Sequence, residues 1–137
     1  MLTRHRYGVL ATCSEAGPHP TLVAFAVSAD LGTLLFATPR ATRKFAHLHR
    51  FSQSALLVDD RQNNAAATHE AQAVTAYGRA EEVAGADRDA LLSLYLRRHP
   101  GLRAFAVAPS CALMQIRVER YGLVSHFQNV IELRMMP

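Results

Sequence analysis

Residues 34–48 read Leu34-Leu35-Phe36-Ala37-Thr38-Pro39-Arg40-Ala41-Thr42-Arg43-Lys44-Phe45-Ala46-His47-Leu48. The apolar first part predicts a β-strand. The second part predicts a helix that begins after Thr38-Pro39 or after Thr42, because threonine is a common N-cap and proline a common first helical residue. Either start leaves unpaired backbone N–H groups beside threonine hydroxyls and three cations, Arg40, Arg43 and Lys44. Such a turn suits a phosphate group.

The positions of Arg43 and Lys44 strengthen this interpretation. Cations in the first turn of a helix oppose the helix dipole, and they lower stability unless an anion compensates them. An ordinary alternative stays open, because threonine caps many helices and exposed Arg and Lys side chains are normal on any protein surface.

Length and composition predict a single domain, residues 1–137, with one sizeable core. Half of the residues are hydrophobic and 19% are charged, which is typical of folded globular proteins. No apolar run approaches the ~20 residues of a membrane-spanning helix. No apolar segment with a cleavage site follows the basic N-terminus, so we expect a cytoplasmic protein with no membrane partner.

The formal net charge of +4 does not by itself indicate a nucleic-acid partner. The arginines are scattered along the whole chain, and no basic run is interleaved with aromatic residues. We therefore expect no nucleic-acid partner.

The cysteines and histidines predict neither a disulfide framework nor a metal site. Cys13 and Cys111 lie in apolar, strand-like segments, so we expect two buried thiols. His47 and His49 lie two residues apart on a predicted helix and therefore face different directions. No HxxxH or HExxH spacing occurs, and no metal ligand is assigned.

The rest of the pattern predicts a mainly β, mostly antiparallel protein that forms a small closed or half-closed barrel. The predicted strands are 7–13, 21–28, 33–37, 55–58, 71–83, 111–119 and 123–133, and the predicted helices are 42–50 and 88–98. The nearly apolar strand 21–28 is expected to be covered on both sides. Gly78 indicates a bulge or a close approach of another strand, and Asp87 is the expected N-cap of the second helix.

This order of elements resembles the FMN-binding split-barrel proteins related to pyridoxamine 5′-phosphate oxidase. The closest correspondence is a third strand ending in Phe36-Ala37-Thr38, followed by Thr42-Arg43-Lys44. The resemblance implies a Greek-key-like split barrel and a homodimer, with FMN in a groove at the subunit interface. It assigns the flavin phosphate to Thr38, Thr42, Arg43 and Lys44.

The resemblance also implies contacts to the rest of the flavin. The second strand, through the backbone and side chains of residues 21–25, would flank the ring and the ribityl chain, with Thr21, Val23 and Phe25 as the assigned residues. Arg61 and Asn63, in the polar stretch after the fourth strand, are candidates for hydrogen bonds to ring or ribityl oxygens. A solvated turn is the alternative for that stretch.

The resemblance implies a flavin-dependent oxidoreductase without naming its reaction. Ala73-Val74 stands where the oxidase has a glutamine, and the chain has no tryptophan to cover the ring. No residue is therefore assigned a catalytic role. Three alternatives stay open: a non-catalytic flavin carrier or sensor, a heme carrier of the same fold, and a deazaflavin-dependent reductase.

Overall fold

The computed structural model describes residues 1–60, 72–125 and 129–136. The strands are β1 (Tyr7–Ser14), β2 (Gly17–Val27), β3 (Thr33–Pro39), β4 (Gln53–Asp59), β5 (Gln72–Glu82), β6 (Cys111–Ser125) and β7 (Asn129–Arg134). The helices are α1 (Arg43–Arg50), α2 (Arg88–Arg98) and α3 (Arg103–Ala106), with 3₁₀ turns η2 (Gly85–Asp87) and η3 (Pro100–Leu102). Among the described residues, no helix is both long enough and apolar enough to cross a membrane.

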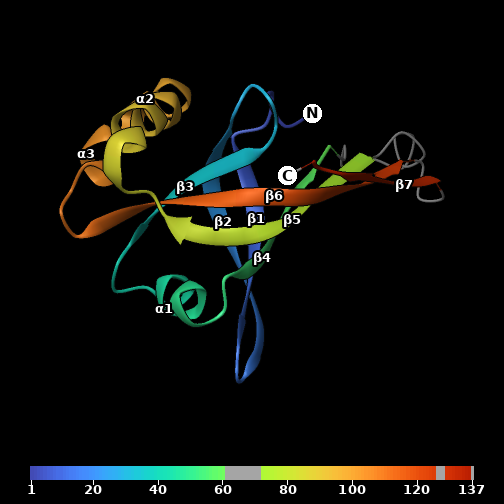
Figure 1. Ribbon diagram of the computed structural model, residues 1–137, viewed down its shortest axis with the longest axis horizontal. Coiled ribbons are helices and arrows are strands. Elements are labelled where there is room, and N and C mark those ends of the chain that lie inside the picture. The colour runs from blue at the N-terminus through green and yellow to red at the C-terminus, as the bar shows by residue number, and fades with distance from the viewer. Residues whose placement is uncertain (61–71, 126–128, 137) are drawn as a thin grey trace.

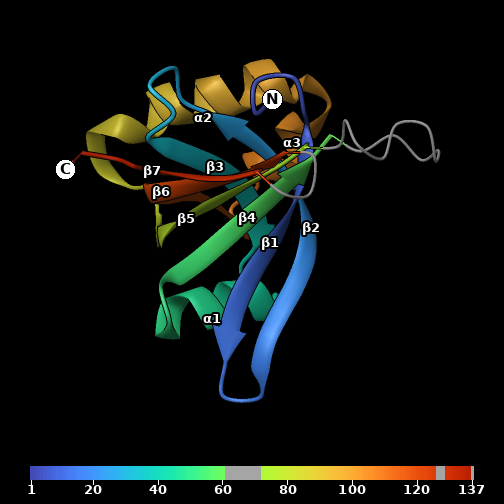
Figure 2. The same ribbon diagram turned by 90° about the vertical axis from the view of Figure 1, so that its right-hand side faces the viewer.

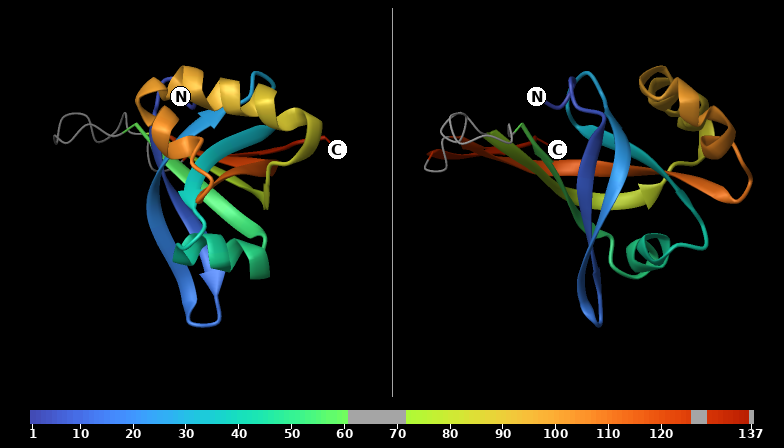
Figure 3. Two further views of the ribbon diagram at one scale, coloured as in Figure 1. Left: turned by 90° about the vertical axis from the view of Figure 1, so that its left-hand side faces the viewer. Right: turned by 180° about the vertical axis from the view of Figure 1, so that it is seen from behind.

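The strands form one antiparallel sheet in the order β3-β2-β1-β4-β5-β6-β7 (Figure 1). An additional pairing of β3 with β6 closes six strands into a barrel and leaves β7 as an extension beside β6. Helix α1 lies apart from α2 and α3, with the sheet between them (Figure 3). The turn of the β1–β2 hairpin lies beyond α1 (Figure 2). These features confirm the predicted mainly β split barrel.

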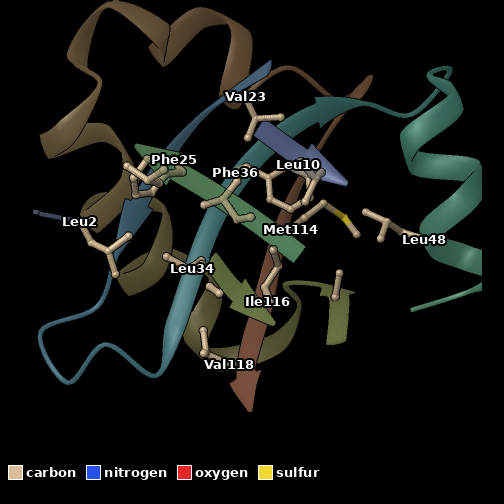
Figure 4. Close-up of a cluster of buried hydrophobic side chains, with 14 of the residues drawn as sticks. Leu2, Leu10, Val23, Phe25, Leu34, Phe36, Leu48, Met114, Ile116 and Val118 are labelled. Carbon is tan, nitrogen blue, oxygen red and sulfur yellow. The ribbon is translucent and has the colours of Figure 1, made fainter. Parts of the chain in front are cut away.

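Strict alternation along the first half of β6 gives the molecule two apolar clusters. One face fills the barrel, where Met114 and Ile116 meet Leu10 and Phe36 (Figure 4). The opposite face carries Cys111 and Leu113, which pack under α2 and α3 in a second cluster with Leu35 of β3, Tyr95 of α2 and Ala106 of α3. Because both faces of this strand are covered, β6 joins the barrel interior to the helical layer.

The predicted boundary between the last two strands was wrong. The expected strands 111–119 and 123–133 are instead a continuous β6 and a separate β7. The register of β5 against β6 shifts between Tyr77 and Gly78, so Glu119 is an extra residue that the ladder absorbs as a bulge. Asp87 is the N-cap residue of α2 as predicted, but its side chain makes no capping hydrogen bond, because its backbone is already helical at the end of η2.

Two predictions of burial were also wrong. Cys111 is buried as expected, but Cys13 is exposed on β1. The strand 21–28 is not covered on both sides, because Leu22 keeps 69% of its surface exposed. Burial within one chain accounts for Val23, Phe25 and Ala26 but not for Leu22.

Candidate functional site

Helix α1 begins where the second of the two predicted starts places it. Thr42 is the N-cap, and its Oγ1 accepts a hydrogen bond from the Phe45 N–H at 3.3 Å. Pro39 is the last residue of β3, so the alternative start after Thr38-Pro39 was wrong. The N–H groups of Arg43 and Lys44, in the first turn, have no acceptor within the helix.

The two threonine hydroxyls of the turn bond to the turn itself. Thr42 Oγ1 donates to the Pro39 carbonyl at 2.9 Å, and Thr38 Oγ1 lies 2.9 Å from Thr42 Oγ1. Thr38 is fully buried. The structure thus gives both hydroxyls a role in joining β3 to α1, and their contact with a phosphate stays a prediction.

The cations of the turn divide into paired and unpaired groups. Arg40 makes a two-pronged contact with Glu82 at 2.8 and 2.6 Å, which raises the pKa of the guanidinium and lowers the pKa of the carboxyl. Arg50 pairs with Glu15. Among the described residues, no carboxylate pairs with Arg43 or Lys44.

Lys44 is in an unusual position for an unpaired cation. Its side chain is half-buried, and burial lowers the pKa of its ammonium group. No acidic residue lies in the first turn of α1, where one would normally balance the helix dipole. A bound anion would compensate both the buried ammonium and the free N–H groups.

The barrel opens beside this turn, because β2 and β3 pair only briefly. Their register consists of Phe25↔Phe36, Ala26↔Leu35 and Val27↔Leu34. Residues 17–24 of β2 keep their pairing with β1 but have no β3 partner. We call the region between residues 17–24 of β2 and the end of β3 the split.

The backbone N–H and C=O groups of alternate residues of β2 face the split. The Phe25 N–H donates to the Arg6 carbonyl on the β1 side at 3.0 Å. Because polar groups alternate in an antiparallel strand, the amide and carbonyl of Leu22 face the split. Pro18 and Pro20 occupy the same side of the strand, where their missing N–H groups cost no ladder bond.

The side chains predicted from β2 lie mainly inside the barrel. Val23 and Phe25 are buried in its core (Figure 4), and their backbone N–H and C=O groups face β1 by the same alternation. The Thr21 hydroxyl is buried and has no hydrogen-bond partner among the described residues. A buried hydroxyl without a partner is costly, and a ligand's polar atom would relieve it. Arg61 and Asn63 lie outside the described residues.

The outer face of the barrel carries an exposed apolar row across β2, β1 and β4. Leu22, Val9 and Leu57 are cross-strand partners, with exposed fractions of 69%, 37% and 38%. A cavity of about 380 Å³ lies on the outer side of β1, β4, β5 and β6. Its lining includes Arg120, whose guanidinium carbon lies 3.7 Å from the centre of the Tyr77 ring.

The histidines near α1 contact the hairpin. His47 Nδ1 lies 3.1 Å from Thr12 Oγ1, and its ring meets the edge of the His19 ring at 5.3 Å. No group of three or more His, Cys, Asp or Glu side chains within residues 1–60, 72–125 and 129–136 could hold a metal ion. The contacts of the His47 ring pack α1 against the β1–β2 hairpin.

The structure brings together the four predicted phosphate residues and places them beside the predicted strand β2. The predicted range 21–25 includes Leu22, but sequence reasoning did not single out its backbone as the part without a β3 partner. A signal for it was present, because prolines at alternate positions of an apolar strand, Pro18 and Pro20, indicate one unpaired edge.

The family of the chain follows from its sequence. A family model for pyridoxamine 5′-phosphate oxidase matches residues 1–125. The chain belongs to this family. No curated protein matches the chain in sequence. The match covers the complete barrel but ends before β7, so β7 lies outside the part that the family model describes.

Solved structures show the same fold at low sequence identity. A heme binding protein from Mycobacterium smegmatis has a TM-score of 0.83 at 16% identity, over 94% of this chain and 52% of that one. A FAD-binding protein from Mesorhizobium loti has a TM-score of 0.71 at 16% identity, over 89% and 85%. General Stress Protein 26 from Bacillus anthracis has a TM-score of 0.73 at 17% identity, over 98% and 93%. The chain thus spans about half the length of the mycobacterial protein.

Proposed function

We propose that this chain binds FMN as a cytoplasmic homodimer and acts as an FMN-dependent oxidoreductase on a small molecule still to be identified. The observation that carries the proposal is the pair of cations Arg43 and Lys44, which have no carboxylate partner among the described residues and flank the free N–H groups of α1. Family membership supports a flavin as the ligand, and a FAD-binding neighbour of the same fold is consistent with it.

The polar groups around the split fit the other parts of FMN. Arg43, Lys44 and the first N–H groups of α1 would hold the phosphate dianion. The orphaned Thr21 hydroxyl and the backbone of Leu22 would meet polar atoms of the ribityl chain or the ring. When bound, FMN would supply the redox chemistry, while these residues bind and orient it.

The exposed apolar row supports the homodimer. Leu22, Val9 and Leu57 are large side chains on the outer face of adjacent strands, where a single chain leaves them in water. A contiguous apolar patch of this kind is typical of an interaction surface. Because Leu22 belongs both to this row and to the edge of the split, a second copy packed there would border the flavin.

The absorption spectrum of the purified protein, followed by titration with FMN, tests the proposal. We expect flavin bands as purified or after FMN is added, because the cations provide a phosphate site. A Soret band in their place would favour the heme alternative. A colourless protein that rejects FMN would contradict the proposal, and binding of a deazaflavin by such a protein would favour that cofactor. Turnover with an added reductant separates an enzyme from a carrier.

Charges placed in the apolar row are expected to separate the homodimer. Leu22→Glu combined with Leu57→Glu should give a monomer with weaker FMN binding, measured by analytical ultracentrifugation and FMN titration. Neither substitution buries a charge within one chain, since both leucines are substantially exposed. The matched control is Leu133→Glu on β7, where an equally exposed leucine lies off this row. A dimer that survives the double substitution would contradict the proposed interface.

A further inference from the structure

Tyr95 of α2 reaches the point where β2 and β3 separate. Its ring is fully buried in the cluster beneath the helices. Its hydroxyl donates to the Ala24 carbonyl of β2 at 3.2 Å. The backbone N–H of Ala37 in β3 lies near the same oxygen and acts to lower the pKa of the hydroxyl. A side chain from outside the sheet thus bonds to β2 and lies beside β3 at the same point.

The strand register shows that this hydroxyl takes the place of a direct hydrogen bond between β2 and β3. The last direct pair is Phe25↔Phe36, so the next pair in sequence would be Ala24↔Ala37. The Thr33 carbonyl accepts from the Ser28 N–H on the β2 side, and alternation places the Ala37 N–H on that side too. The Ala24 carbonyl faces β3 by the same rule. A regular ladder would join these two groups directly, and the Tyr95 oxygen lies between them instead.

Beyond this pair, the ladder is chemically prevented from continuing. The following hydrogen-bonded pair would be Leu22↔Pro39, and Pro39 has no N–H to donate. Pro20, the next residue of β2 on this side, lacks an N–H as well. Ala24 and Ala37 therefore form the position nearest the split at which the two strands could still bond in the regular pattern.

We infer that the Tyr95 hydroxyl is a wedge that holds β2 and β3 apart and thereby sets the opening of the split. It does so by bonding to the Ala24 carbonyl of β2 and by occupying the place where that carbonyl would meet the Ala37 N–H of β3. Insofar as FMN occupies the split, which rests on the proposed function above, Tyr95 is a positioning residue for the cofactor. It acts through β2, since its own ring lies beneath the helices.

Tyr95→Phe removes the wedge and keeps the buried ring. In the FMN-free protein, direct pairing of Ala24 with Ala37 would bring the Hα atoms of Val23 and Thr38 together as a non-hydrogen-bonded pair. We expect a nuclear Overhauser contact between these two protons in the variant and none in the unmodified protein. We also expect FMN affinity to fall at least tenfold.

Tyr121→Phe is the matched control. Tyr121 is also buried, and its hydroxyl also donates to a backbone carbonyl, that of Leu31, at 2.6 Å. It lies on β6, away from the split. A comparable loss of thermal stability is expected in both variants, but a change in the Val23–Thr38 contact only in Tyr95→Phe.

Three results would overturn the inference. One is a Val23–Thr38 contact already present in the unmodified protein, a measurement that stands even if the variant does not fold. Another is a folded Tyr95→Phe variant in which the contact is still absent. The third is a variant that gains the contact but keeps FMN affinity within twofold. If the unmodified protein rejects FMN while the contact behaves as expected, the proposed function fails and the wedge stands.

Discussion

Gly78→Ala is expected to lower the melting temperature by roughly 10 °C, a destabilisation of about 3 kcal/mol. A Cβ at this position would overlap the Arg117 carbonyl oxygen, and would lie 2.9 Å from the Arg117 carbonyl carbon and 3.0 Å from Ile116 Cγ2. Arg117 pairs with β5 on one side and with Thr33 of β3 on the other. Its backbone therefore cannot shift without weakening both ladders. Differential scanning calorimetry measures the change.

Gly101→Ala is the control for this substitution. No atom lies within 4 Å of a Cβ built on Gly101, and its backbone is not in the left-handed region. Its melting temperature should stay within about 2 °C of the unmodified protein, the effect of a surface change. Equal stability of Gly78→Ala and the unmodified chain would mean that β5 and β6 do not approach as closely at this bulge as the structure shows.

Much of the barrel could be predicted because its determinants are local. Gly78 was identified from an isolated glycine within a strand pattern, and its close approach to β6 is confirmed. The alternation along residues 111–119 places Met114 and Ile116 on one face of the strand, and that face fills the barrel. Thr42 provided one of two helix starts, and a single hydrogen bond to Phe45 decides between them. These signals lie within a few residues of the structure they determine.

The features that were missed depend on contacts between distant segments. An apolar run such as 21–28 looks the same whether another layer of its own chain or a second molecule covers it, so the exposure of Leu22 could not be predicted. Asp87 is the N-cap of α2 as predicted, but the preceding 3₁₀ turn fixes its backbone and its side chain makes no capping bond. No local pattern indicates which strand the Tyr95 hydroxyl reaches.

The candidate site also combines a local sequence signal with contacts between distant segments. The sequence placed three cations near one turn, yet their pairing depends on carboxylates far away in the chain. Glu82 neutralises Arg40 from 42 residues away. Arg43 and Lys44 have no such carboxylate among the described residues. The prediction of an anion site therefore became specific only when the fold showed which cations stay uncompensated.

Lys44→Met is expected to weaken FMN binding by roughly 10- to 150-fold, or about 1.5–3 kcal/mol, the contribution of a charge-assisted hydrogen bond. Methionine keeps the apolar stem that the half-buried lysine contributes. Because burial disfavours the ammonium group, the FMN-free variant should be at least as stable as the unmodified protein. Fluorescence titration with FMN and thermal unfolding without it measure the two effects separately.

The pH dependence of FMN binding identifies the charge responsible. Burial lowers the pKa of Lys44 below its usual value of 10.5 in the free protein, so its ammonium is fully present only below that lowered pKa. The affinity should hold from about pH 7, where the phosphate is a dianion, and start to fall, as pH rises, before pH 10.5. Lys44→Arg should remove this part of the fall, since a guanidinium stays protonated there.

Arg50→Met, on the same helix but paired with Glu15, should leave affinity within twofold. Equal losses from Arg50→Met and Lys44→Met would mean that the general positive field attracts FMN, and the assignment of the phosphate to the first turn of α1 would fail.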